Sequence, residues 1–125
     1  MTATAAELTF RLVDAYNRRD RDAMHALLAE GIDYRRPGEP PLRAPDDVIA
    51  RYERDWASYP DSRVEVRGLV ESGEDVMAEI TMHRALEGRP STREAAVAHR
   101  WHGGRLVRYR QYTDAPAFRG DADRP

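Results

Sequence analysis

The stretch 95–114, AAVAHRWHGGRLVRYRQYTD, constrains the fold most, because it predicts two strands joined by a tight turn. Gly103 and Gly104 lie at the turn, where glycine adopts a positive φ at little cost. Side chains alternate between the two faces of a strand, so each strand offers one mixed face. These faces carry Val97, His99 and Trp101 on the first strand and Val107, Tyr109, Gln111 and Thr113 on the second. Such faces can pack as core or line a pocket.

Three helices are predicted before this hairpin, over residues 3–18, 20–30 and 45–59. The first has apolar residues at helical spacing. Asp20 is a suitable N-cap for the second helix, and Gly31 is expected to end it at the C′ position. A short strand is expected over 32–36, followed by a proline-rich loop.

Four long strands are predicted after Asp61, over 63–70, 76–86 and the two halves of the hairpin, with turns at 72–75 and 87–90. This order predicts an α+β fold, in which a cone-shaped, curved antiparallel sheet carries three N-terminal helices on its concave face. The mouth of such a cone is a usual place for a small-molecule pocket. The 125 residues are expected to form one domain, with a core over 8–114 and a loose C-terminal tail over 115–125.

Composition excludes several classes of function. The chain has no Cys, so disulfides and thiol chemistry are excluded. The formal net charge is −2 and the arginines are interleaved with acids, which argues against nucleic acid as a partner. The opening MTATAAELTF has no basic start and no long apolar run, so neither a signal peptide nor a membrane span is expected, and the protein is predicted to be cytoplasmic.

Several segments carry a family resemblance. They are DAYNRRDRDA over 14–23, Leu27-Leu28-Ala29 with Tyr34 and Pro37-Gly38, GGRLV over 103–107 and RQYTD over 110–114. With them the chain resembles the nuclear-transport-factor-2-like (cystatin-like) superfamily, in particular its SnoaL-like branch of polyketide cyclases, over nearly all of 8–114. The resemblance implies the cone fold and a small-molecule pocket. It is weak for function, because this fold hosts isomerases, cyclases, epoxide hydrolases and binding modules.

The chemistries of this superfamily can be compared position by position. Ketosteroid isomerase-like enzymes need a tyrosine and two aspartates where this chain has Leu12, Arg36 and Ala98, so the resemblance implies that Δ5-3-ketosteroids are not isomerised. Limonene-epoxide-type hydrolases share Tyr34. However, Arg36 replaces their asparagine, and other residues replace their acidic and basic groups, namely Glu79, Thr81 and Gln111. SnoaL-like cyclases commonly carry an acid at the position of Gln111.

Three residues are the catalytic candidates. His99 could be a general base or acid, because its charge changes nearest neutral pH, and the alternative is a neutral core histidine. Tyr34 could stabilise an oxyanion or be core. Gln111 could orient a substrate but cannot transfer a proton as a carboxylate does. Arg36 could bind a carboxylate or enolate, or could extend to solvent.

The expected substrate-binding residues are Arg36, Tyr52, Trp56, Trp101, Tyr109, Glu79 and His83. The aromatic members would suit a planar ligand. Glu79 and His83 share one strand face with Thr81, and the family alignment turns that face inward. The apolar Ile80 and Met82 on the opposite face favour the reverse, so the sequence leaves the orientation open. No metal site is expected, because the histidines have no suitable spacing with carboxylates.

The sequence and the resemblance together predict a cofactor-independent cyclase or isomerase that acts by proton transfer on a polyketide-like or other carbonyl substrate. The alternatives are a non-catalytic binding or dimerisation module and an epoxide hydrolase of the limonene-epoxide type. A homodimer is expected, because Met82, Ala96 and Ala98 are expected to leave apolar groups on the convex sheet face.

Overall fold

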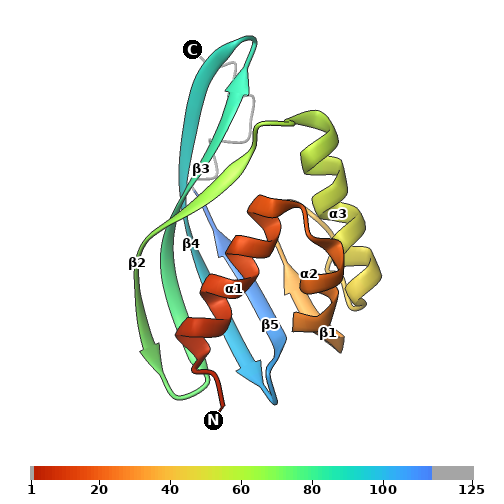
Figure 1. The fold of residues 1–125 in the computed structure, drawn as a ribbon, viewed down its shortest axis with the longest axis vertical. Helices are drawn as coiled ribbons and strands as arrows, with labels where there is room; N and C mark the ends of the chain where they lie inside the picture. The colour runs from red at the N-terminus through yellow and green to blue at the C-terminus, as the bar shows by residue number, and fades with distance from the viewer. Residues whose placement is uncertain (1, 114–125) are drawn as a thin grey trace.

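Three helices and five strands make up residues 2–113, the part of the chain that the computed structural model describes (Figure 1). The helices are α1 (Ala5–Arg18), α2 (Arg21–Leu27) and α3 (Pro45–Ser58). The strands are β1 (Leu28–Arg35), β2 (Arg63–Ser72), β3 (Asp75–Leu86), β4 (Arg89–His102) and β5 (Arg105–Tyr112). The predicted α+β class and order of elements are confirmed. The tail predicted over 115–125 lies outside the described residues.

Side-chain caps set where α1 and α2 begin. Thr4 caps α1 by accepting the Glu7 backbone N–H at 3.1 Å, and the Glu7 carboxylate accepts the Thr4 N–H at 2.9 Å. This capping box places the first helical residue at Ala5, two residues later than predicted. Asp20 caps α2 as predicted, accepting the Ala23 N–H at 3.0 Å.

The predicted end of the second helix is wrong. α2 ends at Leu27, and the chain then extends into β1, where Leu28, Ile32 and Tyr34 are almost fully buried. Gly31 has φ +77° inside β1, where the pairing register shifts between Leu28 and Asp33. The glycine therefore serves a β-bulge rather than a helix C-terminus, and burial of the strand outweighs local helix propensity.

The five strands form one curved sheet in the order β1-β5-β4-β3-β2. The four long strands form the predicted antiparallel meander. β1 pairs with β5 in parallel, so the sheet is not antiparallel throughout. The parallel pair is possible because α3 and three strands separate β1 from β5 along the chain and supply the required crossover.

A second bulge changes which residues of β5 face inward. The register shifts after Arg100, so that Trp101 pairs with Leu106. Leu106 is fully buried, whereas Val107 is only half-buried. The inward position expected for Val107 is thus taken by Leu106, and the alternation resumes at Tyr109 and Gln111.

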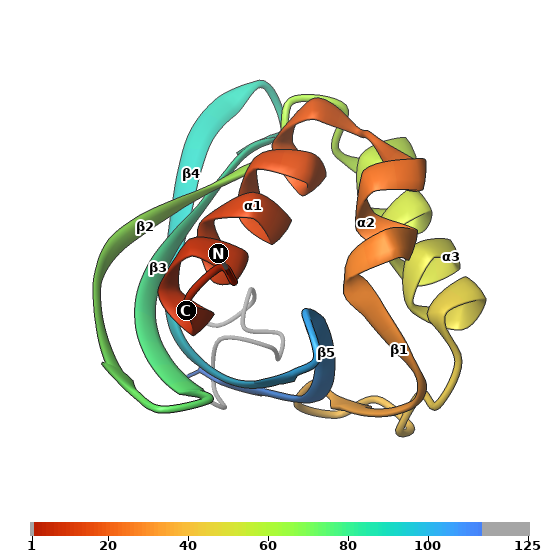
Figure 2. The ribbon, with the colours of Figure 1, turned by 60° about the horizontal axis from the view of Figure 1, so that its bottom comes forward.

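The helices enclose the concave side of the sheet. Figure 2 shows α1 lying inside the curve of β2, β3 and β4, with α2 and α3 beside β1. The buried core lies between these layers. On the convex face, Met77 and Glu79 pair with Ala98 and Ala96, and Met77 is 45% exposed. Met82, expected on this face, instead packs on the concave side. Within residues 2–113, no helix has the length and apolarity needed to cross a membrane.

Candidate active site

A cavity of about 70 Å³ lies between α1, α3 and the concave face of the sheet. Its apolar wall consists of Leu12, Val13, Val64, Ile80, Met82 and Val97. Three tyrosines, Tyr16, Tyr52 and Tyr109, add rings with hydroxyl groups. The remaining lining residues are Arg36, Asp55, His99 and Gln111. A mainly apolar space with a few polar groups is the usual composition of a small-molecule site.

His99 is part of this lining, and its side chain is almost completely buried. Its Nδ1 lies 3.0 Å from the Thr9 hydroxyl oxygen, which also accepts the Trp101 indole N–H at 3.1 Å. Burial lowers the pKa of His99 to about 4, so the imidazole is neutral at pH 7. Trp101 was expected to bind substrate but does not line the cavity. Its indole N–H instead donates to Thr9, which is in turn in contact with His99.

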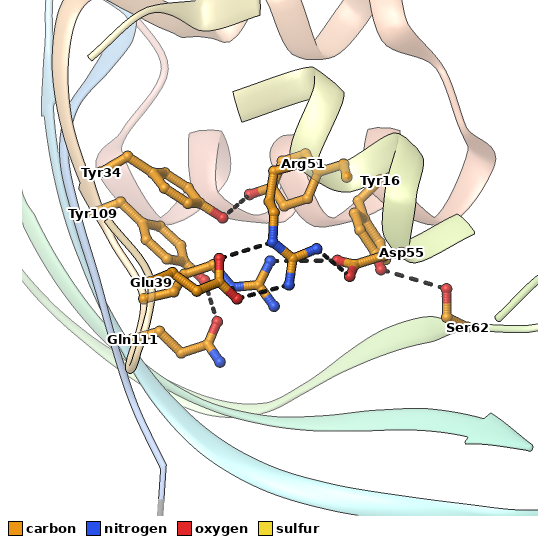
Figure 3. Close-up of polar contacts among 10 residues, drawn as sticks. Tyr16, Tyr34, Glu39, Arg51, Asp55, Ser62, Tyr109 and Gln111 are labelled. Carbon is orange, nitrogen blue, oxygen red and sulfur yellow. Dashed lines mark hydrogen bonds and ion pairs between the residues drawn. The ribbon is translucent and has the colours of Figure 1, made fainter. Parts of the chain in front are cut away.

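Tyr34 faces its tyrosine neighbours rather than the cavity. Its hydroxyl donates to the Tyr52 hydroxyl at 2.9 Å, and its ring stacks on Tyr109 with centroids 4.2 Å apart (Figure 3). Tyr34 is 1% exposed and is not among the lining residues. Burial raises the pKa values of Tyr34 and Tyr109 well above 10, so both stay protonated. Tyr34 thus positions the tyrosines that do reach the cavity.

Gln111 and Tyr109 both line the cavity, as the strand alternation predicted. The Tyr109 hydroxyl donates to Gln111 Oε1 at 3.0 Å. This bond uses one lone pair of the amide oxygen. The two amide N–H groups of Gln111 are its hydrogen-bond donors.

Four charged side chains form a cluster beside the tyrosines (Figure 3). Arg51 donates to Asp55 Oδ1 at 2.6 Å and to both oxygens of Glu39 at 2.7 and 2.8 Å. Arg36 donates to Asp55 Oδ2 through a longer contact of 3.4 Å. The Arg36 side chain is 13% exposed; its buried Nε has no hydrogen-bond partner among the described residues and lies 4.0 Å from Glu39 Oε2. Burial acts to lower the pKa of Arg36, but the neighbouring phenols and carboxylates raise it overall, so the charge is retained.

Asp55 and Tyr16 are site residues that the sequence interpretation missed. Asp55 lies three residues after Tyr52 and one before Trp56, within the apolar stripe of α3. A carboxylate in a buried stripe was the signal that could have identified it. Tyr16 belongs to the apolar stripe of α1, and its hydroxyl lies 3.4 Å from that of Ser62. No sequence signal separated it from the core residues of that stripe.

Besides Trp101, three of the expected substrate-binding residues do not line the cavity. Ile80 and Met82 occupy the cavity side of β3, which turns Glu79 and His83 to the outer face. There His83 Nε2 lies 3.0 Å from a Glu65 carboxylate oxygen on β2. The apolar pattern therefore predicted the orientation correctly, and the family alignment did not. Trp56 packs against Tyr16 with ring centroids 5.5 Å apart and stays outside the lining.

The described residues contain no group of three His, Cys, Asp or Glu side chains that could hold a metal ion. The charges closest to the cavity are those of Arg36 and Asp55. The polar groups of the site can therefore donate hydrogen bonds, accept a proton or stabilise an anion.

Comparison with known proteins gives a family match. The model of the SnoaL-like domain matches residues 10–109. A search of curated protein sequences gives no match. The fold is similar to that of IdmH, a candidate polyketide cyclase from Streptomyces antibioticus, with a TM-score of 0.81, 20% identity, and coverage of 90% of this chain and 93% of that one.

Two other solved structures illustrate the range of the fold. An epoxide hydrolase of M. tuberculosis, described as LEH-like, has a TM-score of 0.77 and 18% identity over 88% of this chain and 78% of that one. An NTF2-like protein of unknown function from Burkholderia pseudomallei has a TM-score of 0.78 and 23% identity over 90% and 92%. At these identities the similarity establishes the fold alone.

Proposed function

The chain belongs to the SnoaL-like domain family, and from this premise we propose that it is a cofactor-independent enzyme, a cyclase or isomerase that moves a proton on a carbonyl-bearing substrate. The observation that carries this proposal is that one largely apolar cavity is lined by both a neutral imidazole, His99, and a carboxylate, Asp55. Enolisation requires a hydrogen-bond donor near the carbonyl oxygen and a base near the adjacent carbon.

Asp55 is the proton acceptor in this proposal. Among residues 2–113, its Oδ2 makes only the 3.4 Å contact with Arg36, so it has lone pairs available to a substrate. Asp55 takes a proton from the carbon beside the carbonyl, and the C–H electron pair becomes the C=C bond of an enolate. Isomerisation is completed when Asp55 returns the proton to another carbon. Cyclisation is completed when the enolate carbon attacks a second carbonyl of the substrate, whose oxygen then takes the proton.

The other polar groups position the substrate and balance its charge. His99 lies against the carbonyl oxygen, and Arg36 stabilises the negative charge of the enolate. Gln111 orients the substrate through its amide N–H groups. Tyr34, the oxyanion donor expected from the sequence, acts indirectly by holding Tyr52 and Tyr109.

The size of the cavity limits which part of a substrate it encloses. Its volume of about 70 Å³ is well below the roughly 300–1,000 Å³ of typical ligand pockets. A polyketide-like substrate would place its reacting end inside and leave the rest outside the cavity. Small ketones are therefore suitable first probes.

Proton–deuterium exchange tests the proposal without knowledge of the natural product. Small cyclic ketones are incubated with the protein in D₂O, and loss of the α-proton signals is followed by NMR. We expect exchange above the buffer rate, and we expect a variant with Asp55→Asn to lose it. Exchange at the buffer rate for a panel of ketones that bind the protein would contradict the enzymatic proposal.

A non-catalytic binding module is the second candidate. The apolar wall favours it, and so does the contact that pairs the Asp55 charge with Arg36. Ketone binding without exchange would support this alternative. An epoxide hydrolase has less support, because the cavity side of β3 carries Ile80 and Met82 rather than charged groups.

We also propose that the protein forms a homodimer through the convex face of the sheet. Met77 is exposed there beside Ala98, and exposed apolar side chains on a sheet face favour a partner. Light scattering at micromolar concentration is expected to give about twice the 14.3 kDa chain mass. The substitution Met77→Glu should give the monomer mass. Phe10→Glu, which alters an exposed apolar residue on α1, should not. A monomeric wild-type protein would contradict the proposal.

A further inference from the structure

Three buried side chains form a hydrogen-bonded chain that ends at the cavity. The Trp101 indole N–H donates to Thr9 Oγ1 at 3.1 Å, and Thr9 Oγ1 lies 3.0 Å from His99 Nδ1. Thr9 is completely buried on α1, and the other two residues lie on β4. No described residue offers a hydrogen bond to the other ring nitrogen, Nε2, and His99 lines the cavity.

The donors and acceptors in this chain fix the position of each hydrogen. An indole N–H can only donate, so Trp101 occupies a lone pair of Thr9 Oγ1. The buried Thr9 O–H then needs an acceptor, and among the described residues Nδ1 of His99 is the only one in contact with it. If Nδ1 carried the hydrogen instead, the Thr9 O–H would remain buried without a partner, which is costly. The arrangement that satisfies all three groups leaves Nδ1 unprotonated.

We propose that Thr9 and Trp101 hold His99 in its neutral Nε2–H tautomer, so that the cavity offers a fixed N–H donor and binds its ligand through a hydrogen-bond acceptor, the carbonyl oxygen of a neutral ketone or related compound. The assignment of a reacting carbonyl rests on the proposed function, whereas the tautomer rests on the three contacts alone. Ligands whose corresponding group can only donate, such as ammonium groups, are disfavoured, because two donors would then face each other.

In this tautomer His99 is a hydrogen-bond donor rather than the general base expected from the sequence. A base would need a free lone pair toward the substrate, and in the Nε2–H form the lone pair on Nδ1 is held by Thr9. The N–H instead stabilises the oxyanion as charge develops on the carbonyl oxygen. Burial supports this role, because a low pKa keeps the ring neutral over the physiological range. Thr9 and Trp101 are positioning residues for that donor.

Nitrogen NMR of the full chain, with ¹⁵N-labelled histidine, tests the tautomer directly. The two ring nitrogens of a neutral imidazole have distinct shifts that show which one carries the hydrogen. The His99 signals are assigned by their loss in His99→Gln. We expect the Nε2–H form at pH 7. The substitution Thr9→Ser should preserve it, and Thr9→Val should shift the ring toward a mixture of tautomers. An Nδ1–H ring, or an imidazolium, in the wild-type protein would overturn the proposal.

A pair of ring compounds tests the ligand preference. Cyclopentanone should move the ring ¹⁵N signals and the Nε2–H proton signal of His99. Cyclopentane, which has the same ring and no acceptor, should leave the Nε2–H hydrogen-bond shift unchanged. Equal effects of both compounds, or no effect of the ketone up to its solubility limit, would overturn the acceptor preference. Neither measurement requires turnover, so a protein with this tautomer and no α-proton exchange would contradict the proposed function while leaving the tautomer assignment in place.

Discussion

Replacing Asp55 by Asn is expected to lower the rate of ketone α-proton exchange by roughly two to four orders of magnitude, the usual contribution of a general base. The amide is nearly the same shape as the carboxylate and can still accept a hydrogen bond from Arg51, but it cannot take a proton. Glu53→Gln is the matched control. It makes the same chemical change two residues earlier on α3, at an exposed carboxylate paired with Arg21. The control should retain the wild-type rate.

The structural role of Asp55 has to be separated from its chemical role. The substitution weakens charged hydrogen bonds to Arg36 and Arg51, so we expect stability to fall by roughly 1–3 kcal/mol. Glu39 still binds Arg51, which limits the loss of stability. The exchange rate is therefore compared per folded molecule, with the folded fraction taken from urea unfolding. A rate within threefold of wild type would show that Asp55 is only a structural partner of the arginines.

Local patterns predicted most of the fold because each element has a signal within a few residues. The Asp20 cap, the proline at the start of α3 and the glycine turns are such signals. Apart from the start of α1, which a local capping box sets, the errors in the fold occur where tertiary contacts decide. Gly31 suits a helix end and a β-bulge equally well, and only the burial of β1 selects the bulge.

The site was harder to predict, because it depends on which face of each strand turns inward and on contacts between distant residues. A shift of one residue on β3 exchanges Glu79 and His83 for Ile80 and Met82, and the family alignment gave the wrong face. His99 and Gln111 were placed correctly by alternation. The Thr9 contact with His99 joins residues 90 positions apart, which no local pattern reveals.

Burial of His99 should make the stability of the protein fall in mild acid. The folded pKa is about 4, against 6.5 for an unperturbed histidine, and burial is the cause. Between these two values the unfolded chain binds a proton at this residue and the folded chain does not, so stability rises with pH in that window. The contribution is fully present above about pH 6.5 and is lost as the pH falls toward 4. At about 1.4 kcal/mol for each pH unit, it amounts to about 3 kcal/mol.

Urea unfolding at several pH values between 4 and 7.5 measures this contribution. Acid also lowers the stability of the folded protein through carboxylates whose pKa values are lowered by hydrogen bonds from arginine. Examples are Asp33 beside Arg110 and Glu39 beside Arg51. The comparison is therefore with His99→Gln, which keeps those groups but has no imidazole to protonate at this position. The wild-type protein should lose about 3 kcal/mol more than this variant between pH 7 and pH 4. His102→Gln, at an exposed histidine, should follow the wild-type curve. Parallel curves for wild type and His99→Gln would mean that His99 is protonated as readily in the folded protein as in the unfolded chain. That result would contradict the neutral, buried imidazole on which the proposed site depends.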